Sequence, residues 1–115
     1  MRLAIFGSRN LVDVDISAYI PEGVTEIISG GARGVDQLAR QYAREKGIPI
    51  VEFLPQYELY GRAAPLRRNE EIAQYADRGI AFWDGASRGT EYTVGVFRRM
   101  GKEISVVMVE KGKLG

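Results

Sequence analysis

The chain contains neither cysteine nor histidine. The missing cysteines exclude a disulfide framework and thiolate metal sites, and the missing histidines exclude an imidazole base, a Ser-His-Asp triad and a histidine-bound zinc ion. No run of eighteen apolar residues occurs, so no membrane span is predicted. Met1 leads directly into a strand-like run rather than a signal peptide, and we therefore expect a cytoplasmic protein with no metal site and no membrane partner.

A surplus of charge of one sign is also missing, because 16 basic and 15 acidic residues leave a formal net charge of +1. Nucleic-acid binding usually neutralises several phosphates at once, so this balance argues against a nucleic acid as partner. With 45% hydrophobic and 27% charged residues, the composition is typical of a globular protein. Residues 1–115 are expected to form a single domain, and a homo-oligomer is left open.

Apolar runs separated by amphipathic runs predict an alternation of strands and helices. We expect strands at residues 3–6, 24–28, 48–54, 79–83 and 104–109, helices at 16–20, 35–43, 65–76 and 90–100, a longer connection at 56–64 and a frayed tail at 110–115. This alternation predicts an α/β fold, a doubly wound parallel sheet of about five strands with helices on both faces. The expected strand order is 3-2-1-4-5.

Three glycine-bearing loops follow the first, second and fourth predicted strands. They read GSRN at residues 7–10, SGGARGVD at 29–36 and DGASRGT at 84–90. Ligands bind a doubly wound sheet beyond the carboxyl ends of its strands, where the strand order reverses, which here lies between the first and fourth strands. Because glycine-rich turns and helix N-termini present N–H groups to anions, these loops predict a phosphate-binding site.

The predicted ligand-binding residues come from these loops and from the following helix. They are Gly7, Ser8, Arg9, Gly30, Gly31, Ala32, Arg33, Gly34, Arg68, Asn69, Gly85, Ser87, Gly89 and Thr90. Thr90 has an equal alternative as an N-cap, and Asn69 as a brace of its loop. Asp36, in the first turn of its helix, is expected to organise the second loop rather than to catalyse.

Three aromatic residues near the predicted site have different expected roles. Trp83 ends an apolar strand, which favours packing in the core over stacking on a base. Tyr57 and Tyr60 lie in the long connection, where stacking on a base is more plausible.

The segments GSRN, SGGARGVDQLA, RRN at residues 67–69 and AFWDGASRGTEYT resemble the SLOG superfamily of Rossmann-like domains, most closely its small YspA-like branch. The resemblance covers about residues 3–109. It is shared more distantly with DprA and with the LOG phosphoribohydrolases, which release a base from a nucleoside monophosphate. It implies a sensor or binding module for a nucleotide or an ADP-ribose-like ligand, with no required cofactor. A nucleotide hydrolase, and last a DprA-like single-stranded DNA binder, are the alternatives that it implies.

The match to the LOG enzymes is incomplete where catalysis is concerned. Arg68, Gly89 and Thr90 match their motifs, but Glu91 directly follows Thr90 and no carboxylate stands at the spacing of their glutamate. Each helical residue turns the side chain by about 100°, so Glu91 is not expected to reach the same sugar. For hydrolysis of an N-glycosidic or pyrophosphate bond, Asp84 and Glu91 are the carboxylates expected to assist departure of the leaving group.

Overall fold

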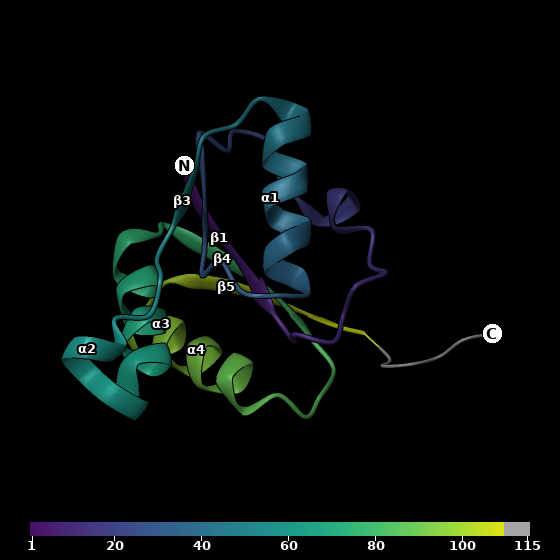
Figure 1. Ribbon diagram of the computed structural model, residues 1–115. Helices are drawn as coiled ribbons and strands as arrows, with labels where there is room; N and C mark the ends of the chain where they lie inside the picture. Colours follow the sequence, from purple (N-terminus) through teal and green to yellow (C-terminus); the bar gives the residue numbers. More distant parts are fainter. Residues whose placement is uncertain (110–115) are drawn as a thin grey trace.

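The computed structural model describes residues 1–109, which form a five-stranded parallel sheet between two helical layers (Figure 1). The strands are β1 (Arg2–Gly7), β2 (Glu26–Ser29), β3 (Ile50–Glu52), β4 (Arg78–Trp83) and β5 (Glu103–Met108). Their order, β3-β2-β1-β4-β5, confirms the predicted order and places its reversal between β1 and β4. The expected fraying of 110–115 lies outside the described residues.

The helices cover both faces of the sheet. They are α1 (Val35–Lys46), α2 (Tyr57–Tyr60), α3 (Ala64–Tyr75) and α4 (Arg88–Arg99), with 3-10 turns η1 (Ile16–Tyr19) and η2 (Gly61–Ala63). α1 packs with η1 on one face, and α3 and α4 lie together on the other (Figure 1). In residues 1–109, no helix is both long and apolar enough to cross a membrane.

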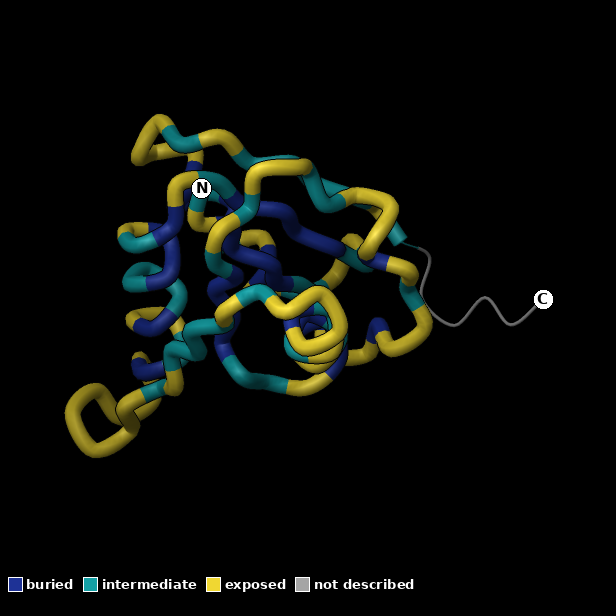
Figure 2. Tube along the Cα trace, turned by 90° about the horizontal axis from the view of Figure 1, so that it is seen from above, coloured by how far each residue is buried: buried dark blue, intermediate teal, exposed yellow. Residues whose placement is uncertain are grey.

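The central strands carry apolar side chains on both faces, because helices cover both sides of a parallel sheet. Along β1, Leu3 and Ile5 belong to the core cluster on the α1 side, whereas Ala4 and Phe6 belong to the cluster under α3 and α4. This alternation follows the two-residue period of a strand. Figure 2 shows the buried segments gathered in the middle of the molecule.

The third strand is shorter than the predicted range 48–54. Only residues 50–52 pair as a strand with β2. Pro49 has no N–H for the ladder, although its carbonyl accepts a hydrogen bond from the Ile27 N–H at 2.9 Å. Because β3 lies at the edge of the sheet, it pairs on one side only.

The connection 56–64 contains two short helical segments, α2 and η2, that the sequence pattern did not predict. α2 has no buried residue, and it ends at Gly61, whose φ is +55°. Tyr57 and Leu59 are 58% and 70% exposed. α2 projects from the body of the protein at the lower left of Figures 1 and 2. Four residues are too few to show an apolar period, which explains why the pattern missed this segment.

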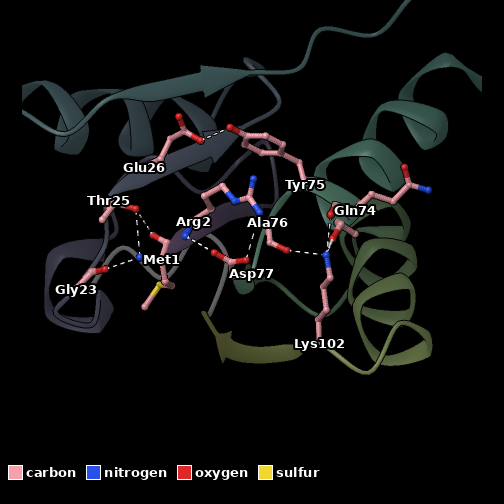
Figure 3. A network of polar contacts seen from close by, with 11 residues as sticks. Met1, Arg2, Gly23, Thr25, Glu26, Gln74, Tyr75, Ala76, Asp77 and Lys102 are labelled. Carbon is pink, nitrogen blue, oxygen red and sulfur yellow. Dashed lines mark hydrogen bonds and ion pairs between the residues drawn. The ribbon is translucent and has the colours of Figure 1, made fainter.

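At the amino edge of the sheet, Lys102 closes the C-terminal end of α3 (Figure 3). Its Nζ donates to the carbonyl oxygens of Ala73, Gln74 and Ala76 at 2.7, 2.8 and 2.7 Å. The last carbonyls of a helix lack partners within the helix and carry the negative end of its dipole. One ammonium group therefore satisfies three carbonyls at once.

We expect Lys102→Met to lower the free energy of unfolding by about 1–2 kcal/mol, because charge-assisted hydrogen bonds to the α3 carbonyls are lost. Urea denaturation measures the change. Lys46→Met, at an exposed position in the last turn of α1, is the matched control and is expected to cost less than about 0.5 kcal/mol. Equal losses in the two variants would contradict this role of Lys102.

Candidate functional site

A cavity of about 490 Å³, here called the major cavity, opens at the carboxyl edge of the sheet between the loops that follow β1 and β4. Its lining residues are Phe6, Gly7, Ser8, Arg9, Asn10, Ala32, Asp36, Pro65, Leu66, Arg68, Asn69, Asp84, Ala86, Ser87, Gly89, Thr90 and Thr93. The first turns of α1, α3 and α4 all contribute to this wall, so three positive helix ends face one space.

A second cavity of about 220 Å³, here called the minor cavity, lies beside the first. It is lined by Arg9, Gly30, Gly31, Ala32, Arg33, Leu54, Pro55 and Arg68. Arg9, Ala32 and Arg68 line both cavities, so the two are neighbours that share a wall.

The two cavities bring together most of the predicted ligand-binding residues. The major cavity contains Gly7, Ser8, Arg9, Ala32, Arg68, Asn69, Ser87, Gly89 and Thr90, and the minor cavity adds Gly30, Gly31 and Arg33. In the described part of the chain, Gly34, Gly85 and Glu91 line neither cavity. Asp84 faces the major cavity, whereas Glu91 is exposed on α4. The structure therefore separates the two carboxylates predicted for catalysis.

Sequence reasoning missed the apolar wall formed by Pro65 and Leu66 at the start of α3. A signal for it was present in the topology. In a parallel sheet the connecting helices run antiparallel to the strands, so their N-termini lie at the carboxyl edge. Pro65, near the start of a predicted helix, therefore belonged to the same edge as the glycine loops.

Ser8 and Asp84 join the loops that follow β1 and β4. Ser8 is buried, its N–H donates to the Phe82 carbonyl at 3.1 Å, and its Oγ accepts from the Asp84 N–H at 3.2 Å. The Asp84 Oδ1 accepts from the N–H groups of Ala86 and Ser87, both at 2.9 Å. These two backbone donors lower the pKa of Asp84 to about 2. Asp84 is therefore ionised at neutral pH and has no proton to give as a general acid.

Ser87, not Thr90, is the N-cap of α4. The helix begins at Arg88 rather than at residue 90, and the Ser87 Oγ accepts from the Thr90 N–H at 3.3 Å. The hydroxyls of Ser87 and Thr90 lie 3.0 Å apart. The capping alternative for Thr90 is thus wrong. The first N–H groups of the helix, at Arg88 and Gly89, have no helical acceptor and lie beside the major cavity.

The glycine loop after β2 uses two of its backbone donors internally. The Gly31 N–H donates to Ser29 Oγ at 3.3 Å, and the Ala32 N–H donates to Asp36 Oδ2 at 3.0 Å. Asp36 thus fixes the course of the loop from the first turn of α1. Because these two N–H groups already donate to side chains, this loop has fewer backbone donors for an anion than its sequence predicts.

Asp36 and Arg68 are buried side chains of opposite charge that both line the major cavity. Each is only 7% exposed. Burial raises the pKa of Asp36, and the Ala32 N–H and the Arg68 charge act against that rise. The Oδ1 of Asp36 is buried and has no hydrogen-bond partner among residues 1–109. The Arg68 charge therefore offsets part of the cost of burying the Asp36 carboxylate.

Arg68, one of the predicted ligand-binding residues, also connects three segments of the chain. Its Nη1 donates to the carbonyl oxygens of Gly30 and Phe53 at 2.6 and 3.3 Å, and its Nε donates to Asn69 Oδ1 at 2.7 Å. A Cβ on Gly30 would lie 2.6 Å from Nη1, so glycine is needed for this approach. These hydrogen bonds use Nε and Nη1, and Arg68 also lines both cavities.

The three aromatic residues considered for base stacking, Trp83, Tyr57 and Tyr60, are not among the lining residues of the two cavities. Trp83 is half-buried, and its Nε1 donates to the Ser87 carbonyl at 2.9 Å, which braces the loop after β4. Tyr60 lies under the Arg67 guanidinium, with 5.1 Å between the ring centroid and Cζ. Tyr57 and Tyr60, the two tyrosines of α2, are not among the lining residues of either cavity. No group of three carboxylates suited to a metal ion occurs in residues 1–109.

The geometry can be compared with known proteins. A family model described as the YspA, cpYpsA-related SLOG family matches residues 1–60, which is just over half of the chain. The matched range includes the loop after β1 and the glycine loop after β2. No curated protein and no solved structure matches the chain.

Proposed function

The chain belongs to the YspA, cpYpsA-related SLOG family, and we propose that it binds a nucleotide or a nucleotide-derived small molecule as a sensor or binding module. Family membership indicates a role in nucleotide binding or processing. The observation that carries the proposal is the major cavity at the reversal of the strand order. A doubly wound sheet binds ligands at this position.

The start of α4 supports a phosphate position in the major cavity. Gly89 has no side chain, and no atom beyond its chain neighbours and the backbone of its own helix lies within 4 Å of where its Cβ would be, so a ligand can approach the backbone there. The N–H groups of Arg88 and Gly89 and the dipole of a twelve-residue helix attract an anion. Asn10 and Asn69 lie on the same wall and offer hydrogen bonds to a sugar or a base.

Hydrolysis is the second candidate and has less support. Asp84 is ionised and holds two backbone N–H groups, and Glu91 lies on the exposed side of α4. A leaving group at a glycosidic bond needs a proton donor, and Asp84 does not supply one at neutral pH. Binding of single-stranded DNA has the weakest support, because the net charge is only +1.

The proposal predicts that Gly89→Asp weakens AMP binding at least about tenfold, or about 1.4 kcal/mol. The new carboxylate would stand in the first turn of α4, where it favours the helix dipole but repels a phosphate. Isothermal titration calorimetry with AMP measures the change. Thermal unfolding checks that the variant remains folded.

Gly89→Ala is the matched control, since it adds the same Cβ without the charge. Its difference in affinity from Gly89→Asp reports the electrostatic contribution of this position. Equal affinities for AMP in these two variants would show that no phosphate lies at the start of α4. The absence of AMP, ADP and ADP-ribose binding at millimolar concentration would overturn the proposed function.

A further inference from the structure

The two neighbouring cavities differ in the charges of their walls. The major cavity has Arg9 and Arg68 balanced by Asp36 and Asp84. The minor cavity has Arg9, Arg33 and Arg68, and no carboxylate is among its lining residues. The smaller space therefore carries the stronger positive field of the two.

Arg68 gives the minor cavity a built wall rather than a set of mobile surface charges. The residue is 93% buried, as follows from its exposure of 7%, and two of its nitrogens are held by Gly30, Phe53 and Asn69. The guanidinium therefore stands at a fixed place in the wall that both cavities share. A guanidinium held in this way binds a phosphate oxygen with little loss of conformational freedom.

The charged residues around the minor cavity leave its positive field in place. Glu52, which lies near Gly31, is paired with Arg40, whose Nη2 and Nε approach Glu52 Oε2 at 2.7 and 2.8 Å. Asp36 accepts the Ala32 N–H and lies beside Arg68. Arg9 and Arg33 are exposed at the rim, where they can turn toward a ligand.

The sizes of the two cavities are consistent with their binding different parts of one ligand. About 490 Å³ lies within the range of pockets that hold small molecules, whereas about 220 Å³ lies below that range. The minor cavity therefore suits a charged group of a larger ligand rather than a ligand of its own.

We propose that the ligand carries at least two phosphoryl groups, and that the minor cavity, through Arg9, Arg33 and Arg68, binds the one farther from the nucleoside. This inference rests on the proposed function and narrows its ligand to a nucleoside diphosphate or a pyrophosphate-linked nucleotide. The nucleoside and its first phosphate occupy the major cavity. Both ligand classes contain two linked phosphoryl groups, and the second phosphoryl group lies beside Arg33.

Calorimetry with AMP, ADP and ADP-ribose tests this assignment on the wild-type chain and on Arg33→Gln. We expect ADP or ADP-ribose to bind the wild type at least about tenfold more tightly than AMP, a difference of about 1.4 kcal/mol. Arg33→Gln is expected to remove most of that preference while AMP binding stays within about twofold, because only the minor cavity contains Arg33. Tighter binding of ADP would identify a terminal phosphate, and tighter binding of ADP-ribose an internal one.

Arg44→Gln, an exposed change in the last turn of α1, is the control for loss of one positive charge and should leave the preference intact. The inference is overturned if AMP binds the wild type as tightly as both diphosphates, and in that case the proposed function still stands. It is also overturned if Arg33→Gln weakens AMP and ADP equally. Failure of all three ligands to bind would overturn the inference together with the proposed function.

Discussion

Gly34→Ala is expected to lower the free energy of unfolding by at least about 3 kcal/mol, from the combined cost of backbone strain and overpacking. Gly34 has φ +73° and ψ −124°, a conformation that residues with a Cβ rarely adopt. An added Cβ would lie 2.4 Å from the Arg9 carbonyl oxygen and 2.7 Å from that of Ser8. Both neighbours are backbone atoms of the loop after β1, so no side-chain rotation relieves the clash.

Gly101→Ala provides the matched control for this experiment. Gly101 also has a positive φ, +70°, but no atom lies within 4 Å of where its Cβ would be. The control therefore carries the cost of a left-handed alanine alone, about 1–2 kcal/mol. Denaturant midpoints of both variants, at equal m-values, give the comparison. If Gly34→Ala loses no more stability than Gly101→Ala, the close contact between the two loops is not a constraint.

Arg68→Met is expected to cost at least about 3 kcal/mol, because charge-assisted hydrogen bonds are lost and their part-buried acceptors are left without a donor. The substitution keeps a long apolar side chain but removes the bonds to Gly30, Phe53 and Asn69. It also leaves Asp36 buried without the charge that compensates it. Because a domain of this size has a total stability of only about 5–15 kcal/mol, denaturant unfolding should detect the loss easily.

A double-mutant cycle separates the two contributions to that loss. Asp36→Asn is nearly isosteric and its amide oxygen still accepts the Ala32 N–H. In the Arg68→Met background it should recover at least about 1 kcal/mol, because no uncompensated carboxylate remains. Additive effects of the two substitutions would show that the charges do not interact. A wild-type midpoint for Arg68→Met would show that Arg68 does not brace the site.

The strand order, and a cavity at the carboxyl edge where that order reverses, were predictable because apolar periodicity is a local signal. β1, β4 and α1 are recognised from their own residues, and the rule that parallel strands present their carboxyl ends together then places the loops. The limits of β3 and α2 were not predictable in this way. β3 depends on which residues β2 can pair with, and α2 is a single exposed turn.

The role of Arg68 shows what a sequence pattern cannot reach. An arginine beside glycine loops is predicted to bind a ligand, but the pattern does not show that its side chain is buried against the backbone of Gly30, thirty-eight residues earlier. Likewise, the Gly31 and Ala32 N–H groups were expected to face a ligand, and they are occupied by Ser29 and Asp36. The partner of Arg68 is distant in sequence, whereas the partners of Gly31 and Ala32 are local side chains whose hydrogen bonds a pattern of residue types does not show.

The projecting segment α2 has an evolutionary consequence. Its neighbours Leu54, Pro55, Pro65 and Leu66 form walls of the two cavities, whereas α2 itself buries no residue. Insertions and deletions are tolerated in such exposed connections, whereas the close contact of Gly34 with Arg9 leaves no room for an added residue where the two glycine loops touch. Among relatives, chain length is therefore expected to vary between β3 and α3. That variation would change the shape of the cavities near Leu54 and Pro65. Arg9 and Arg68, which line both cavities, lie outside this connection.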